Sequence, residues 1–183
     1  MNELPTVIVL ASGRGERFVA SGGNGSKLRA LLAGKAVLEH TLANVQASGL
    51  PWHLEDAGHP GMGDSIAAAV RNTAEAAGWL ILPGDLPLVT PATLRQVAAM
   101  LVGQTQAAQP SYRGERGHPV GFSRACRDAL MALEGNLGAA PVLKAQRAAG
   151  RVADIEVDDV GIVTDIDTLE MLARAEALLV NAS

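Results

Sequence analysis

The chain has 183 residues, of which 48% are hydrophobic and 19% are charged, and its formal net charge at pH 7 is −4. This length suits one domain, residues 1–183, with a sizeable core, and the composition excludes a disordered chain. The negative balance argues against a nucleic-acid partner, and no apolar run approaches the roughly 20 residues that cross a bilayer. Glu3 and the lack of early cations argue against a secretory signal, so we expect a cytoplasmic protein whose lone Cys126 is buried in a helix.

Short apolar runs alternate with helical patterns in the first half of the chain. A continuous or β-branched run is typical of a buried strand, whereas apolar residues three and four apart are typical of an amphipathic helix. In the helix after the third strand, Thr90 would be the N-cap, Pro91 the first helical residue and Gly103 the stop. We predict strands at residues 6–11, 51–55 and 79–85, and helices at residues 36–49, 63–78 and 90–103.

The second half begins with a pattern of strand, turn and strand at residues 107–122, a small hairpin-like insertion. Strand–helix alternation implies right-handed crossovers, so the predicted fold class is α/β, with three layers (α/β/α) around a mostly parallel, Rossmann-like sheet. Ligands bind such sheets beyond the carboxyl ends of the strands. We predict helices at residues 123–133, 138–150 and 168–180, and strands at residues 152–157 and 161–167.

The segment after the first strand, residues 12–28, combines glycines with the cations Arg14, Arg17 and Lys27. Glycine lets several backbone N–H groups face one anion, and arginine adds a fork that binds phosphate oxygens. We therefore expect a polyphosphate ligand there. The alternative is an ordinary surface loop, and residues 19–26 are the part that we expect to be mobile.

Charge is distributed unevenly along the chain. Residues 14–35 hold five cations and one acid, whereas residues 154–170 hold seven acids and neither Lys nor Arg. A cationic loop and an acidic segment in one small domain suit a phosphate ligand with a divalent metal. Two solvated faces of opposite sign are the alternative interpretation.

Two familiar phosphate motifs are not matched. The dinucleotide fingerprint G-x-G-x-x-G needs glycine at position 18, where this chain has Phe18. A P-loop fails because Arg29 and Ala36 stand at its key positions. A plain dinucleotide-binding module is therefore the weakest of the functional hypotheses.

A third pattern fits better. The stretch "LASGRGERF…SKL" resembles the L-A-x-G-x-G-x-R-[MF]…K signature of nucleotidyltransferases, especially the MobA-like NTP transferases and, among them, the molybdenum cofactor cytidylyltransferases. Four further stretches follow in the family's order: "GMGDSI" at 61–66, "LPGDLPLV" at 82–89, "GHPVGF" at 117–122 and "TDIDTLE" at 164–170. The resemblance implies a GT-A-like nucleotidyltransferase fold. It also implies transfer of a nucleoside monophosphate from an NTP to a phosphorylated acceptor, here molybdopterin, with release of pyrophosphate.

The resemblance implies a metal site in which Asp85, the acid of the family's "GD" motif, binds Mg²⁺, with Mn²⁺ as the alternative. A carboxylate at the carboxyl end of a central strand suits a hard cation independently; the alternative for Asp85 is a turn-capping role. Asp165 and Asp167 would complete the site or contact the acceptor. Asp167 has a rival interpretation, because Glu170 follows at capping-box spacing and Asp167 would then cap the last helix.

The resemblance also assigns roles around the substrates. Arg17, Lys27 and Asp85 would carry catalysis, and His118 and Asn136 would contact the acceptor. The helix that opens at "GMGDS" would direct its N-terminus at an anion, or would simply be capped by Asp64 or Ser65. The expected nucleotide-binding residues are Leu10, Ala11, Ser12, Gly13, Gly15, Arg17, Lys27, Gly63, Ser65 and Gly84.

The chain departs from the family's pattern in three places. Ser12 stands where relatives carry Ala or Gly with cytidine or guanosine use respectively, so CTP is favoured and GTP is the alternative. Only about a dozen residues separate Gly49 from Gly61, which leaves a thin or rebuilt wall for the base. Asn136 and Ala140 replace an acid and an arginine, which weakens the acceptor assignment.

Two alternatives therefore stay open beside the leading hypothesis. One keeps the chemistry but makes the acceptor a sugar or polyol phosphate. The other is a non-catalytic accessory protein that binds molybdenum cofactor and delivers it to a molybdoenzyme. Arg17, Lys27 and Asp85 together argue for the enzyme. The expected partners are an NTP, a phosphorylated small-molecule acceptor and a receiving molybdoenzyme, with neither nucleic acid nor membrane.

Overall fold

The computed structural model describes residues 3–13 and 15–181, and Arg14 lies outside the described residues. Its centre is a mixed seven-stranded sheet with β9 paired to β6. Strands β4, β1, β5, β6 and β9 run in one direction, and β7 and β8 run against them. The order across the sheet is β4 (Trp52–Glu55), β1 (Thr6–Leu10), β5 (Gly78–Pro83), β8 (Val120–Ser123), β6 (Ala107–Tyr112) and β7 (Glu115–Arg116), with β9 at Val152–Glu156.

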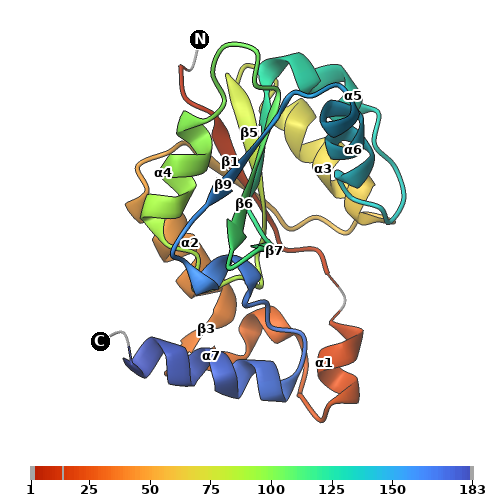
Figure 1. Ribbon diagram of the computed structural model, residues 1–183. Helices are drawn as coiled ribbons and strands as arrows, with labels where there is room; N and C mark the ends of the chain where they lie inside the picture. Colours follow the sequence, from red (N-terminus) through yellow and green to blue (C-terminus); the bar gives the residue numbers. More distant parts are fainter. Residues whose placement is uncertain (1–2, 14, 182–183) are drawn as a thin grey trace.

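Helices cover both faces of this sheet (Figure 1). On one face lie α2 (Val37–Ala47) and α4 (Pro91–Ala99). On the other lie α3 (Met62–Asn72), α5 (Arg127–Met131) and α6 (Ala140–Ala148). The predicted three-layer α/β/α architecture with a mostly parallel sheet is thus confirmed, and the predicted hairpin forms the antiparallel part of the same sheet.

The continuous apolar runs of β1 and β5 follow from the position of these strands between two layers of helices. Successive strand residues point to opposite faces, and both faces are covered by helices. Val7 and Val9 therefore pack into the cluster beneath α2 and α4, whereas Ile8 packs into the cluster beneath α3. Strand β5 divides in the same way, with Leu80 on one side and Trp79 on the other.

A smaller lobe lies beyond the carboxyl ends of β1 and β5 (Figure 1). It contains α1 (Glu16–Ala20), the 3-10 turn η1 (Lys27–Arg29), the strand pair β2 (Leu31–Leu32) and β3 (Lys35–Ala36), and α7 (Leu169–Asn181). Phe18, which stands where the dinucleotide fingerprint needs glycine, is buried here among Leu28, Leu32 and Ile166. The glycine-rich segment thus contains a helix that the sequence did not predict.

Several predicted elements are corrected. Residues 161–167 are not a strand: they begin in the 3-10 turn η3 (Val160–Val163), because the Asp159 side chain accepts from the Gly161 N–H at 2.9 Å. Helix α4 starts at Pro91 with Thr90 as its N-cap, as predicted, but ends at Ala99 instead of Gly103. Residues 123–133 divide into the 3-10 turn η2 (Arg124–Cys126) and α5.

Cys126 is buried, as expected, although it lies in the 3-10 turn η2 and not in an α-helix. Its burial raises the pKa of the thiol. Within residues 3–13 and 15–181, none of the helices combines the length and the apolar character that a membrane crossing requires.

Candidate functional site

The centre of the candidate site is an ion-pair network around Lys27. Its Nζ lies 2.6 Å from Oδ2 of Asp85 and 2.5 Å from Oδ1 of Asp167. Arg17 approaches the other oxygen of Asp167, with 2.8 Å between NH1 and Oδ2. The Lys27 side chain is 14% exposed and that of Arg17 is 82% exposed, so the two cations reach the same carboxylate from different environments.

Three carboxylates converge beside this lysine. Oxygen atoms of Asp85, Asp165 and Asp167 all lie within 4.8 Å of one another, and all three residues are partly buried. Asp85 follows β5 after one residue, Gly84, whereas the other two follow the turn η3. The main chain joins these segments, because the N–H of Ile166 donates to the carbonyl of Asp85 at 3.0 Å. Three carboxylates are suitable ligands for Mg²⁺ or Mn²⁺. The position attracts cations, because two of these carboxylates already bind the ammonium of Lys27.

The rival interpretation of Asp167 as a helix cap is wrong. The hydroxyl of Thr168 accepts from the N–H of Met171 at 3.2 Å, and the carbonyl of Thr168 accepts from Leu172 at 3.0 Å. Thr168 therefore performs the capping role one residue later than expected. The carboxylate of Asp167 is left to pair with Lys27 and Arg17.

The charges in this cluster shift one another's pKa values. Burial lowers the pKa of Lys27, but the charges of Asp85 and Asp167 and their hydrogen bonds outweigh burial and hold it above its usual value. Burial raises the pKa of Asp167, but the bond and charge of Lys27 reverse this and hold it below its usual value. The pKa of Asp165 is raised, first by burial and then by the charges of Asp167 and Asp85. Lys27 forms ion pairs with Asp85 and Asp167, whereas no ion pair to Asp165 is formed within the described residues.

Two cavities meet at this cluster. The first, of about 620 Å³, includes Gly13, Gly15, Arg17, Lys27, Asp85, His118, Asp165 and Asp167 in its lining. The second, of about 390 Å³, includes Leu10, Ser12, Gly13, Lys27, Ser65, Gly84, Asp85 and Asn136. Lys27 and Asp85 line both, so the ion-pair network lies where the two cavities join.

The wall of the second cavity is built by close backbone packing. Gly84 donates its N–H to the carbonyl of Leu10 at 2.8 Å, and a Cβ on Gly84 would lie 2.9 Å from that oxygen. The hydroxyls of Ser12 and Ser65 lie 2.9 Å apart and join the end of β1 to α3. The backbone contact between Gly84 and Leu10 and the side-chain contact between Ser12 and Ser65 therefore shape this cavity.

A sequence profile of the MobA-like NTP transferase domain matches residues 43–152, which is more than half of the chain. The chain belongs to this family. The profile match begins after the glycine-rich segment, so the family assignment is independent of the "LASGRGERF" signature that first suggested it. Both lines of evidence support nucleotidyl transfer from an NTP as the general chemistry.

Solved structures agree with the family at the level of the fold. A nucleotidyl transferase from Methanothermobacter thermautotroptrophicus (Mth528) matches with a TM-score of 0.82 at 23% identity over 100% of both chains. Rv0371c from Mycobacterium tuberculosis in complex with manganese matches with a TM-score of 0.71 at 22% identity, over 97% of this chain and 100% of that one. A CMP:2-keto-3-deoxy-manno-octonic acid synthetase complexed with CTP matches with a TM-score of 0.68 at 15% identity, over 98% of this chain and 100% of that one. A search of curated proteins found no significant match.

Within this MobA-like domain, most residues that the sequence singled out line one of the two cavities; Ala11 and Gly63 line neither. One of the N–H groups at the N-terminus of α3 is already bonded, because the N–H of Gly63 donates to the carbonyl of Gly135 at 2.7 Å. Neither Asp64 nor Ser65 caps the helix; Gly61 stands at the N-cap, and Asp64 accepts from the Gly135 N–H at 3.0 Å. The segment 134–136 thus covers the helix end.

The two expected acceptor residues are separated. His118 lines the first cavity, and burial lowers the pKa of its imidazole. Asn136 lines the second cavity, together with Ser12 and Ser65, so it does not share a cavity with His118.

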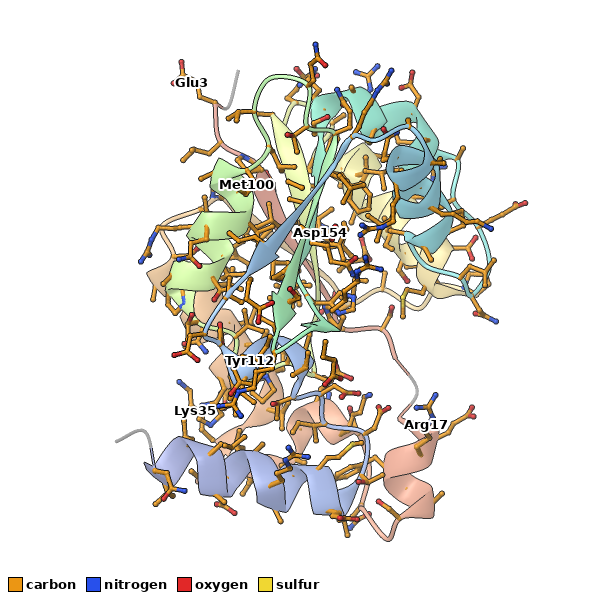
Figure 2. The ribbon with its side chains drawn as sticks, viewed as in Figure 1. Glu3, Arg17, Lys35, Met100, Tyr112 and Asp154 are labelled. Carbon is orange, nitrogen blue, oxygen red and sulfur yellow. The ribbon has the colours of Figure 1, made fainter. Side chains whose placement is uncertain are left out.

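Arg17 lies on α1, at the opposite end of the molecule from Glu3 (Figure 2).

Sequence reasoning missed several lining residues. Glu16 and Met62 line both cavities, and Glu115 and Arg116 of β7 line the first. His59 and Pro60 line the second. The position of Glu16 follows from the helix α1, which a glycine-rich segment did not suggest, and that of β7 from the hairpin. The short segment before Gly61 was the available signal for His59.

Proposed function

We propose that the protein transfers a nucleoside monophosphate from an NTP, with CTP favoured, to the phosphate of molybdopterin, and releases pyrophosphate. One observation carries this proposal: Lys27 and Asp85 line two adjoining cavities at once. A transferase needs two substrates whose reacting groups meet at one point. Two separate spaces with a shared cationic and acidic boundary fit that requirement.

The nucleotide is assigned to the second cavity and the acceptor to the first. Ser12, Gly13 and Ser65 would surround the nucleoside, and its triphosphate would extend to Lys27. The exposed Arg17 would reach the β- and γ-phosphates from α1, since a guanidinium binds phosphate oxygens with two donors. Asn136 belongs with the nucleotide in this arrangement, and His118 with the acceptor.

Asp85, Asp165 and Asp167 would hold Mg²⁺, with Mn²⁺ as a substitute. A bound divalent cation would supply charge stabilisation to the phosphate oxygens of the NTP. The raised pKa of Asp165 supports this role, because burial and the charges of Asp167 and Asp85 disfavour its ionised form and a bound cation would offset them.

The protein's own groups would act mainly by positioning and by charge. An oxygen of the acceptor phosphate forms a bond to the α-phosphorus, and the bond from that phosphorus to the bridging oxygen breaks, so that pyrophosphate leaves with the electron pair. A phosphate is already a nucleophile at neutral pH, so no residue needs to remove a proton. Lys27 and Arg17 would offset the negative charge that gathers on the departing pyrophosphate.

A third cavity supports an acceptor with a ring system. It has a volume of about 260 Å³, and its lining includes Ile66, Val120, Phe122 and Leu143. Met62 and Pro83 line all three cavities, and His118 lines this cavity and the first, so the third cavity adjoins both of the others. A pterin could extend into it, whereas a short polyol phosphate has no apolar part to place there. We propose a cytoplasmic location, with a molybdoenzyme as the recipient of the product.

Pyrophosphate release tests the proposal. The protein would be incubated with Mg²⁺, molybdopterin and each of CTP, GTP, ATP and UTP, beside Asp85→Ala and the control Asp158→Ala, whose exposed carboxylate lies outside the triad. We expect release with CTP that depends on the acceptor, is lost in Asp85→Ala and survives in the control. Release of pyrophosphate with a sugar phosphate in place of molybdopterin, and not with molybdopterin itself, would show that the acceptor is the sugar phosphate. Tight binding of molybdopterin without release from any NTP would favour the accessory protein.

A further inference from the structure

Glu55 forms a buried polar cluster that the transfer chemistry does not use. It is the last residue of β4, is 4% exposed, and pairs with Leu10 at the carboxyl end of β1. Its Oε1 lies 3.0 Å from Nε2 of His59 and accepts from the N–H of Ala57 at 3.3 Å. Its Oε2 lies 3.4 Å from Nε2 of His53.

The cluster is placed at the nucleotide side of the site. His59 lines the second cavity, next to Pro60 and Gly61, and the same cavity is lined by Ser12 and Ser65. His53 lines none of the three cavities described above. In the segment that the sequence suggested would be a thin wall, the second cavity is thus lined by a histidine whose ring contacts a buried carboxylate.

The bond to Glu55 determines what His59 offers to a ligand. A carboxylate only accepts, so a neutral imidazole bonded to it through Nε2 carries its proton on that nitrogen. The other nitrogen, Nδ1, is then an acceptor, and no bond to it is formed by the residues that the structure describes. A hydrogen-bond acceptor on a residue that lines the cavity assigned to the nucleotide matches an amino group on the edge of the base.

A metal site is a poorer interpretation of this cluster. Within the described part of the chain, Asp85, Asp165 and Asp167 form the single group of three candidate ligands whose atoms lie within 4.8 Å of one another. The two histidines contact different oxygens of Glu55, which suits a carboxylate that orients two rings separately.

We infer that His59 is a specificity-determining residue that accepts a hydrogen bond from the exocyclic amino group of cytosine, and that Glu55 is the positioning residue that fixes its tautomer. The inference rests on the proposed function. It makes His59 the residue that distinguishes CTP from UTP. These nucleotides differ at the 4-position, where cytosine carries an amino donor and uracil a carbonyl acceptor. Uracil would place an acceptor against an acceptor and leave both unpaired.

The dissociation constants of CTP and UTP, measured by calorimetry in the presence of Mg²⁺, test this choice without any turnover. We expect the wild-type protein to bind CTP at least about tenfold more tightly than UTP. His59→Phe keeps a ring but removes both nitrogens and should bring the ratio close to one. Glu55→Gln offers an amide donor to Nε2, which allows the tautomer with a proton on Nδ1, so the ratio should shift towards UTP by about tenfold. His53→Phe removes the other partner of Glu55 and should leave the ratio unchanged.

The outcomes separate this inference from the function on which it rests. A residue with a merely structural role would weaken CTP and UTP equally and leave their ratio intact. An unchanged ratio in both His59→Phe and Glu55→Gln, or a wild-type preference for UTP, overturns the inference and leaves the transferase standing. Failure of the folded wild-type protein to bind any NTP overturns both.

Discussion

The ammonium of Lys27 and the carboxylate of Asp85 form an ion pair with 2.6 Å between Nζ and Oδ2. The same ammonium lies 2.5 Å from Asp167, so one side chain bridges two of the three carboxylates of the triad. A divalent cation bound by these carboxylates would compete with Lys27 for them. Lys27 would therefore be released towards the triphosphate when metal and nucleotide arrive together.

Lys27→Met should tighten the binding of Mn²⁺ in the absence of nucleotide, because the carboxylates lose their resident cation. We expect the dissociation constant of Mn²⁺, followed by electron paramagnetic resonance, to fall about tenfold, while transfer falls about 100-fold. Lys35→Met, at an exposed lysine of β3, is the matched control and should change neither. Equal Mn²⁺ affinity in Lys27→Met and wild type would contradict this competition.

Arg17→Ala should reduce turnover by about 100-fold, by analogy with the loss of one donor to a developing charge. Its stability should stay within about 0.5 kcal/mol of wild type, because the guanidinium is 82% exposed and surface ion pairs contribute little. Arg29→Ala is the control: Arg29 is also exposed, but lines neither main cavity. Single-turnover kinetics and urea unfolding measure the two quantities, and wild-type turnover in Arg17→Ala would remove this residue from the proposed mechanism.

Gly84→Ala should destabilise the protein by about 1–3 kcal/mol, because its Cβ would lie 2.9 Å from the carbonyl of Leu10 and 3.1 Å from the side chain of Leu38. Gly58→Ala is the matched control, since a Cβ there meets nothing within 4 Å, and its effect should stay within about 0.5 kcal/mol. Urea unfolding of both variants measures the difference. Equal stability of the two would show that β5 shifts away from β1 without cost.

Asp165→Asn should stabilise the metal-free protein at neutral pH. The pKa of Asp165 is raised by burial and by Asp167 and Asp85, so the folded state favours its protonated form. Its favourable contribution is complete below the ordinary value of 3.8 and is lost as pH rises through the raised pKa of the folded state. An uncharged amide avoids that loss, so the advantage of Asp165→Asn should be largest near pH 7 and shrink towards pH 4.

Denaturation in the presence of EDTA at several pH values measures the effect, with the exposed Asp158→Asn as the control. Added Mn²⁺ should reverse the order, because the protein that retains all three carboxylates binds the cation more tightly and is stabilised more by it. An advantage that persists in Mn²⁺ would argue that Asp165 is not a metal ligand.

The centre of the site could be predicted because its signals are local. Strands β1 and β5 are continuous apolar runs, and the second residue after each is a residue of the site, Ser12 and Asp85 respectively. The edge of the sheet at which they meet follows from their parallel pairing alone. The assignment of Asp167 could not be decided in this way, because adjacent residues, Asp167 and Thr168, both suit an N-cap and only the folded backbone selects one.

Other parts of the site depend on contacts between distant segments. The N–H of Gly63, which has no partner within α3, is bonded to Gly135, a residue far away in the sequence. Likewise, the proposed role of His59 depends on Glu55, and nothing in the sequence spacing indicates that His59 lines the same cavity as Ser12. Phe18 illustrates the opposite error, because a segment rich in glycine carried one buried aromatic residue that was sufficient to anchor α1.

The backbone bond from Ile166 to Asp85 has a consequence for how this site can be altered. Ile166 is fully buried, and its flanking residues are Asp165 and Asp167. The separation of the two acidic segments is thus built into the scaffold and does not rely on the carboxylates themselves. Replacement of any one acid should leave the other two in position. The three carboxylates can therefore be substituted one at a time, by mutagenesis or in evolution, without loss of the arrangement of the others.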